Sequence, residues 1–297
     1  MDRAAVVDRR RIDRNPLRLG RQWKQRYVPG RKGTTGLAVV GFFALMAVLA
    51  GWIVPYSPHQ ANFAAWQPPS WAHWLGTDDY GQDVLSQLIV GSRASLVVGV
   101  LAGLLSGMIG VTVGITAGFK GGATDEILMR FVDFLLVIPT LALMIVISAF
   151  IPSSGQTTEI LVIGGLSWLW MARVVRSQVM SERRRGYVDA ARVLGVSDRE
   201  IMFREILPNV IPVIIANMTL IITVSILVQA SLNFLGIGSP TAISWGSMLS
   251  LAFADNAIDQ GAWWWTIPPG LCLTLLAYGF SLIGHAILEG YAQTREE

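Results

Sequence analysis

The stretch SERRRGYVDAARVLGVSDREIMFREILPNVIP, residues 181–212, is the only dense charge cluster outside the N-terminus. Long hydrophobic segments flank it on both sides. Of the 297 residues in the chain, 53% are hydrophobic and only 14% are charged, whereas soluble domains carry about 25% charged residues. The composition therefore predicts an all-α polytopic membrane protein that exposes this polar stretch to water.

Six apolar segments are long enough to cross a bilayer as helices, at a rise of about 1.5 Å per residue. They are residues 36–54, 94–119, 131–150, 160–175, 210–234 and 267–288. This pattern predicts a domain organisation with five parts. These are a basic arm (1–35), a first transmembrane helix (36–54), an outer loop (55–92), a core of five further helices (93–288) and a polar tail (289–297).

The basic residues indicate how the chain is oriented. All but one of the 23 Lys and Arg residues lie in the N-terminal arm, between the second and third spans, around the polar stretch or in the tail. A six-span chain places all these segments on one side, which the positive-inside rule identifies as cytosolic. Both termini are therefore expected in the cytosol, and Arg93 is the exception, at the outer end of the second span. The arm is interpreted as an anchor on anionic lipid rather than a nucleic-acid-binding segment.

The segments predicted to face outward carry acidic residues. Residues 55–92 contain Asp78, Asp79 and Asp83 and no Lys or Arg. A short outer loop covers residues 151–159, and the last outer loop covers residues 236–265. This last loop ends in three consecutive tryptophans, residues 263–265, which are expected to form an aromatic belt at the membrane interface.

Glycines recur along the second span at positions that share one helix face. Six of them fall within about 100° of each other at 100° per residue. They are Gly99, Gly103, Gly107, Gly110, Gly114 and Gly118. Such a stripe of small residues predicts close approach of another helix, and the pattern leaves open whether that helix belongs to this chain or to another.

The polar stretch is expected to form two short helices outside the bilayer. The first covers residues 187–194 and ends at Gly195, a residue that readily adopts the left-handed conformation of a helix C-terminus. Ser197 begins a Ser-x-x-Glu capping box for a second helix over residues 198–206. Leu207 and Pro208 are predicted to end that helix and return the chain to the membrane. These features fit either an amphipathic hairpin on lipid headgroups or a docking lever for a cytosolic partner.

A resemblance distinguishes the two possibilities. YVDAARVLG (residues 187–195), followed by ILP (206–208), resembles the signature loop of ABC importer permeases, in which Glu-Ala-Ala precedes a glycine and a hydrophobic residue with Leu-Pro. LGTDDYGQDVLSQLIVGSRASL (75–96) is similar to the segment entering the core of dipeptide and oligopeptide permeases, in the second of their two membrane subunits. Three further segments match the same group: GFKGGATDEILMRFVDFLLVIPTL (118–141), QASLNFLGIG (229–238) and SWGSML (244–249). The resemblance covers about residues 36–288.

The resemblance implies a six-helix type I ABC importer permease fold in the cell membrane of a bacterium or archaeon. It also implies a heterodimer with a homologous permease subunit, with the translocation pathway between the two. Two cytosolic ATPase subunits each receive one such loop, here residues 181–209, and an extracytoplasmic substrate-binding protein delivers the substrate. Relatives of this kind carry dipeptides, oligopeptides, nickel chelates, glutathione or sugars.

The resemblance and the polar residues predict three groups of site residues. The ATPase-docking residues are Tyr187, Asp189, Ala190, Ala191, Gly195, Leu207 and Pro208. Asp189 stands where the signature commonly has Glu. The polar residues of the fifth span are expected to line the pathway, namely Asn217, Gln229, Ser231 and Asn233. Asp78, Asp79 and Asp83 are expected to lie near the binding protein.

Missing motifs exclude other classes. The chain has no Gly-x-x-x-x-Gly-Lys-Ser/Thr phosphate loop, so ATP and magnesium are expected in partner subunits and no cofactor is expected in this chain. No catalytic constellation and no metal-ligand spacing occur in the sequence, which argues against an enzyme. An ion-coupled secondary transporter is the alternative. It is disfavoured because the spans are nearly free of charge at mid-depth and inverted repeats are not evident.

Overall fold

The computed structural model describes residues 30–151, 155–239 and 241–296, and within these ranges the chain is helical with no β-strand. Most of the basic arm lies outside the described residues. The helices are α2 (Arg31–Ile53), α3 (Val84–Lys120), α4 (Gly122–Val137), α5 (Thr140–Phe150), α6 (Gln156–Leu166), α7 (Leu169–Arg183), α8 (Gly186–Val193), α9 (Asp198–Glu200), the π-helix η1 (Ile201–Ile206), α10 (Leu207–Phe234), α11 (Trp245–Ala254) and α12 (Trp263–Glu296). The predicted all-α class is confirmed.

The membrane-spanning segments agree with the predicted number. Four helical segments are long and apolar enough to cross a bilayer, and two bent pairs, α4 with α5 and α6 with α7, pass the same test together. Counting each pair as one span gives six. The first pair bends by 86° at Pro139, because proline lacks an amide hydrogen and disfavours helical geometry in the residue before it.

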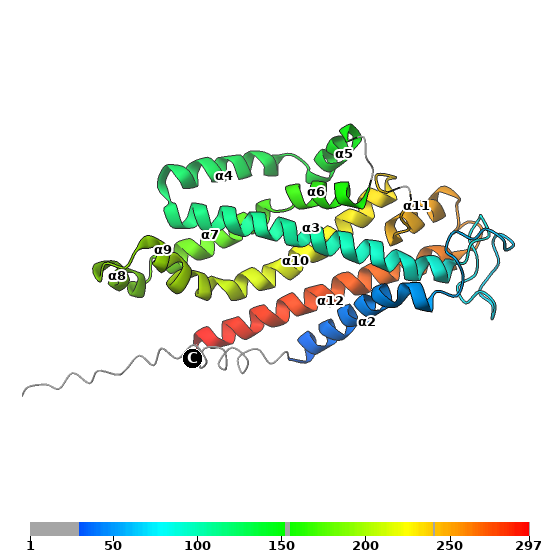
Figure 1. Ribbon diagram of the computed structural model, residues 1–297, viewed down its shortest axis with the longest axis horizontal. Coiled ribbons are helices and arrows are strands. Elements are labelled where there is room, and N and C mark those ends of the chain that lie inside the picture. The colour runs from blue at the N-terminus through cyan, green and yellow to red at the C-terminus, as the bar shows by residue number, and fades with distance from the viewer. Residues whose placement is uncertain (1–29, 152–154, 240, 297) are drawn as a thin grey trace, which may run out of the picture.

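Helix α3 lies at the centre of the bundle (Figure 1), with α6, α7 and α10 packed against it. Its glycine stripe permits this packing. A Cβ atom on Gly103 would lie 2.7 Å from the Cα atom of Ile222 in α10, and one on Gly114 would lie 2.6 Å from the carbonyl oxygen of Ala172 in α7. The helices that approach the stripe therefore belong to this chain, which answers the question left open by the sequence.

Two boundaries differ from the sequence prediction. Helix α3 begins at Val84, because the Asp83 side chain accepts a hydrogen bond from the Ser86 amide at 2.8 Å and caps the helix. The outer loop is correspondingly shorter than residues 55–92. Helix α12 continues to Glu296, so most of the predicted tail is helical. The Lys32 ammonium contacts the Glu289 carboxylate at 2.6 Å and joins α2 to α12.

The predicted break at Leu207 and Pro208 is wrong. The helix continues without interruption from Asp198 to Phe234 through the π-helix η1. In this segment the Leu207 amide donates to the Met202 carbonyl, five residues earlier. The wider turn of a π-helix relieves the clash that Pro208 imposes on the preceding turn of an α-helix.

The expected tryptophan belt is wrong for two of its three members. Trp264 and Trp265 are buried, and only Trp263 is half exposed. The outer loop covers this end of α12: the Trp264 indole donates to the Thr77 carbonyl at 3.2 Å, and the Trp265 ring contacts the Trp66 ring edge to face. These tryptophans hold the loop to α12 and do not reach the lipid interface.

Candidate functional site

The polar loop, residues 181–209, forms one end of the bundle. Figure 1 shows α8 and α9 beyond the turn between α3 and α4, at the end opposite α11. Val188, Ile201 and Ile206 point inward and are almost fully buried. They pack in one cluster with Met171 and Val175 of α7. Apolar burial therefore fixes the loop rigidly to a membrane helix.

The buried carboxylate of Glu182 also holds the polar loop in place through directional hydrogen bonds. The Tyr187 hydroxyl donates to the Glu182 carboxylate at 2.9 Å, and the Arg185 guanidinium contacts the same carboxylate at 3.0 Å. Burial and the neighbouring Glu182 charge raise the pKa of Tyr187 to about 12, so the hydroxyl remains a donor. Asn209 donates to the Tyr187 hydroxyl at 3.4 Å, and its own carbonyl accepts from Tyr291 at 3.1 Å. The loop is thus joined to α7, α10 and α12.

The tip of the polar loop is apolar and exposed. Val193 is 88% exposed and Leu194 is 81% exposed. Gly195 follows with φ of +76°, and no atom of the described part of the chain lies within 4 Å of the position that a Cβ atom would take there. Two apolar side chains held in water beside an open corner form a surface suited to a partner.

The predicted docking residues do not all lie on this tip. Asp189, Ala190, Ala191 and Gly195 share α8 and its corner, and all except the partly buried Ala191 are exposed. Tyr187 turns its hydroxyl inward to Glu182, while Leu207 and Pro208 lie on α10. Sequence reasoning missed Val193 and Leu194, although apolar residues among charged ones in a water-exposed helix were a usable signal.

The four predicted pathway residues separate into two groups. Gln229 and Asn233 are buried, and their side-chain amides donate to the Glu159 carboxylate at 3.5 and 3.0 Å. Asn217 and Ser231 are half-buried and bond to carbonyls of their own helix. The four residues therefore do not form one continuous polar surface in this chain.

Glu159 is a further residue that sequence reasoning missed. It lies in the first turn of α6 and is almost fully buried. Besides Gln229 and Asn233, the Ser239 amide donates to its carboxylate at 2.9 Å. Glu159 thus fastens α6 to α10 and to the segment after α10. The polar residues of the fifth span were the available signal, because buried amides need a partner.

The carboxylates of the outer loop hold the loop together. Asp78 and Asp83 are each 1% exposed. Asp83 accepts from the Ser86 amide and lies 2.8 Å from the His73 imidazole nitrogen. Asp78 accepts from the Gln87 side chain at 2.6 Å. The oxygens of these two carboxylates are enclosed, and the loop exposes Trp71, Trp74 and Tyr80. The nearness of Asp78, Asp79 and Asp83 to a binding protein stays a prediction.

Asp79 is partly buried without a compensating partner at one of its oxygens. Burial, followed by repulsion from Asp255 and Asp78, raises the pKa of Asp79 to about 6. A raised carboxylate pKa stabilises the fold below about pH 4, and that contribution is lost as the pH rises through about 6. We expect Asp79→Asn to raise the thermal unfolding temperature at pH 7.5 and to leave it unchanged at pH 4.

Thermal unfolding of the detergent-solubilised protein between pH 4 and 7.5 measures this effect. Asp259→Asn is the control, because that side chain is exposed on the last outer loop. A lower unfolding temperature for Asp79→Asn at pH 7.5, or a shift that does not vary with pH, contradicts the assignment.

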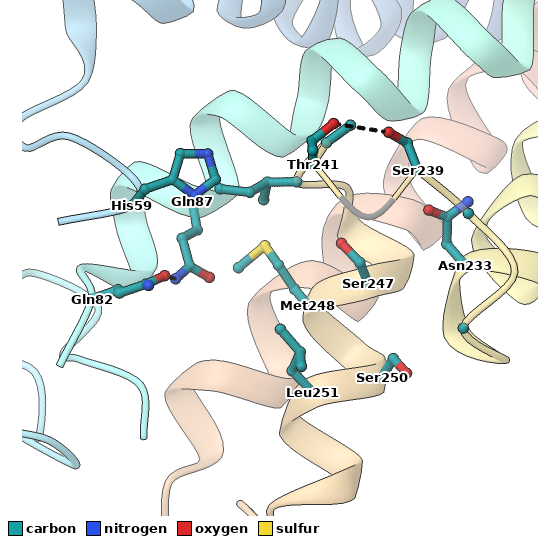
Figure 2. A pocket seen from close by; sticks show the side chains of 14 residues that line it. His59, Gln82, Gln87, Asn233, Ser239, Thr241, Ser247, Met248, Ser250 and Leu251 are labelled. Carbon is teal, nitrogen blue, oxygen red and sulfur yellow. Dashed lines mark hydrogen bonds between the residues drawn. The ribbon is translucent and has the colours of Figure 1, made fainter. Parts of the chain in front are cut away.

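A cavity of about 320 Å³ opens at the end of the helix bundle that is predicted to face outward. Its lining combines hydroxyl and amide side chains with apolar ones, and it comes from α3, α10, α11, the outer loop and the segment between α10 and α11. Figure 2 shows Met248 extending from α11 toward Gln87, with Ser247 and Ser250 on the same helix. Hydroxyl and amide groups of this kind offer hydrogen bonds without fixing a charge.

Comparison with known proteins identifies the family. Residues 110–293 match the model of the binding-protein-dependent transport system inner membrane component, and residues 31–69 match the N-terminal TM domain of oligopeptide transport permease C. The chain is 35% identical to the oligopeptide transport system permease protein OppC of Bacillus subtilis, over 96% of this chain and 92% of that protein. It is 42% identical to the dipeptide transport system permease protein DppC of Escherichia coli, over 88% of this chain and 89% of that protein.

The matches and the geometry agree. The first family match runs from the last part of α3 into α12 and includes the polar loop, and the second covers α2 and part of the outer loop. The relatives align over nearly their whole length. The chain belongs to the family of binding-protein-dependent transport system inner membrane components, the permease subunits of ABC importers in the bacterial cell membrane.

Proposed function

We propose that this chain is one of two homologous membrane subunits of an ATP-driven peptide importer, and that residues 181–209 couple it to a cytosolic ATPase subunit. The exposed apolar tip of the rigidly held polar loop is the observation that carries this proposal. The peptide substrate class is supported by the peptide permeases that the chain resembles.

The proposed assembly contains four partners. A homologous permease subunit completes the pathway, two ATPase subunits bind ATP and magnesium, and an extracytoplasmic binding protein delivers the peptide. This chain supplies no nucleotide site of its own. Its family is that of binding-protein-dependent transporters, which supports this division of work.

The contacts of the polar loop suggest how movement is transmitted. Val188 and Ile206 pack on α7, and η1 continues directly into α10. The same two helices pack against the glycine stripe of α3, at Gly114 and Gly103. Because closely packed interiors have little free volume, displacement of α8 by an ATPase subunit shifts α7 and α10 relative to α3. Such rigid-body movement can alternate access to the pathway.

Glu159 is the one observation that favours an ion-coupled carrier, because carriers use carboxylates buried among membrane helices. Its carboxylate, however, accepts hydrogen bonds from Gln229, Asn233 and the Ser239 amide. Both carboxylate oxygens therefore already have partners, which favours a structural role.

Reconstitution of the complete complex in proteoliposomes tests the proposal. Uptake of a labelled peptide from its binding protein is expected to require ATP and to stop with hydrolysis-deficient ATPase subunits. This chain purified alone is expected to hydrolyse no ATP. Uptake driven by an ion gradient without ATP, or ATP hydrolysis by the isolated chain, contradicts the proposal.

A further inference from the structure

We infer that Arg93 and the cavity beside it receive the carboxylate of the peptide as it enters from the binding protein. This inference rests on the proposed function and adds a site to it. No other Lys or Arg lies between Lys32 and Lys120, a stretch that includes the outer loop and all of α3 up to its final residue.

The Arg93 guanidinium is available for a ligand. Its side chain is exposed, and it makes no hydrogen bond or ion pair with any residue that the structure describes. Two buried carboxylates of the neighbouring elements are already engaged: Asp83 contacts His73, and Glu159 binds amides of α10 and the segment after it. An unpaired guanidinium is a planar donor that matches a carboxylate through two parallel hydrogen bonds.

A cavity of about 390 Å³ adjoins Arg93. Gln156 and Thr241 contribute neutral polar groups to it, and Val90 and Val97 contribute apolar surface. It contains no carboxylate among its lining residues. Apart from His59, Arg93 is the one ionisable residue in this lining. Its positive charge favours an anionic group of a ligand.

This charged cavity continues into the neutral one described above. The two share His59, Thr241, Ala242 and Ile243 as lining residues. The neutral cavity then offers the polar side chains of Gln82 and Ser250, whereas Gln87 is already bonded to Asp78. A peptide held at Arg93 by its carboxylate can place its backbone and side chains against these neutral groups.

The C-terminal carboxylate is the substrate group that best fits this arrangement. Every linear peptide carries it whatever its side chains are, so one arginine can serve peptides of different sequence. Along the exposed face of α3, the residues after Arg93 are apolar: Val97, Leu101, Leu104 and Met108. No second cation follows within the span, so the carboxylate is held at the entrance and not deeper in the membrane, which permits release.

A pair of peptides that differ only at the C-terminus tests the inference. The complete complex is reconstituted in proteoliposomes, and uptake is measured from binding protein saturated with a tripeptide or with its C-terminal amide. The wild-type complex is expected to import the acid faster than the amide, and Arg93→Gln is expected to lower that acid-to-amide ratio about tenfold, the usual cost of losing one charged hydrogen-bond pair. The binding protein is unchanged between variants, so its own preference cancels.

Lys120→Gln is the matched control, because it removes a basic residue at the other end of the same helix. It is expected to leave the ratio unchanged. If Arg93→Gln does not assemble, Arg93→Lys, which keeps the charge but loses the paired donors, is expected to lower the ratio severalfold.

Equal loss of uptake for both peptides in the Arg93 variants overturns the inference, because it indicates a contact with the binding protein or a structural role. An unchanged ratio also overturns it. Failure of the wild-type complex to import either peptide contradicts the proposed function itself, and so the two failures are distinguishable.

Discussion

Gly195→Arg is expected to lower ATP-driven import by the complete complex at least about tenfold while leaving the chain inserted in the membrane. Gly195 has φ of +76°, which costs other residues about 1–2 kcal/mol. None of the residues that the structure describes lies within 4 Å of the Cβ position, so the arginine side chain would occupy the space beside Leu194. A side chain that fills a docking corner of this kind weakens binding of the ATPase subunit at least about tenfold. Peptide uptake and peptide-stimulated ATP hydrolysis in proteoliposomes measure the loss.

Gly195→Ala separates the effect of backbone strain from the effect of side-chain size. It carries the same backbone conformation with only one added methyl group, so it is expected to retain most of the transport. Gly195→Arg and Gly195→Ala should insert equally well, because the corner lies outside the spans. Wild-type import by Gly195→Arg, with the ATPase subunits bound normally, is the result that rules out docking at this corner.

Glu159→Ala is expected to destabilise the chain by about 3 kcal/mol or more. Three donors, on Gln229, Asn233 and Ser239, lose their acceptor inside the protein. Each buried donor left without a partner costs about 1–3 kcal/mol. For a chain of this size such a loss lowers the thermal unfolding temperature by roughly 5 °C or more. Unfolding in detergent, followed by tryptophan fluorescence, measures the change.

Glu126→Ala is the control for this prediction. The Glu126 carboxylate pairs with Arg130 at 2.5 Å on an exposed face, and exposed ion pairs contribute at most about 1 kcal/mol. Glu159→Gln keeps one acceptor oxygen. Its unfolding temperature is expected to lie between those of Glu159→Ala and the wild type. An unfolding temperature for Glu159→Ala within error of the wild type shows that the hydrogen-bonded cluster does not stabilise the chain.

The number of spans and the packing face of α3 could be predicted from the sequence, because both depend on local patterns. A run of apolar residues fixes a span, and glycines at the spacing of Gly103, Gly107 and Gly110 leave one helix face without side chains. The Gly195 corner was predictable for the same reason, since few residues other than glycine adopt positive φ readily.

Three features could not be predicted from the sequence because they depend on tertiary contacts. Pro208 reads as a break, yet the π-helix η1 carries the chain past it into α10. Asp78 reads as a surface charge in an acidic loop, yet it accepts bonds from the Gln82 amide and the Gln87 side chain. The role of Glu159 was not predictable because its partners lie about 70 residues or more away in the chain. Such long-range partners leave no periodic signal.

Site-directed crosslinking at the tip of the polar loop tests the central claim most directly. Cys272 is the only native cysteine, so Cys272→Ser provides the background for Leu194→Cys in the complete complex. A bifunctional thiol reagent is expected to join Leu194→Cys to an ATPase subunit, with a yield that changes between the nucleotide-free and ATP-bound states. Tyr80→Cys, exposed on the outer loop, is expected to give no such product. Absence of an ATPase crosslink at Leu194→Cys in every nucleotide state of an active complex contradicts the claim that residues 181–209 couple this chain to its ATPase.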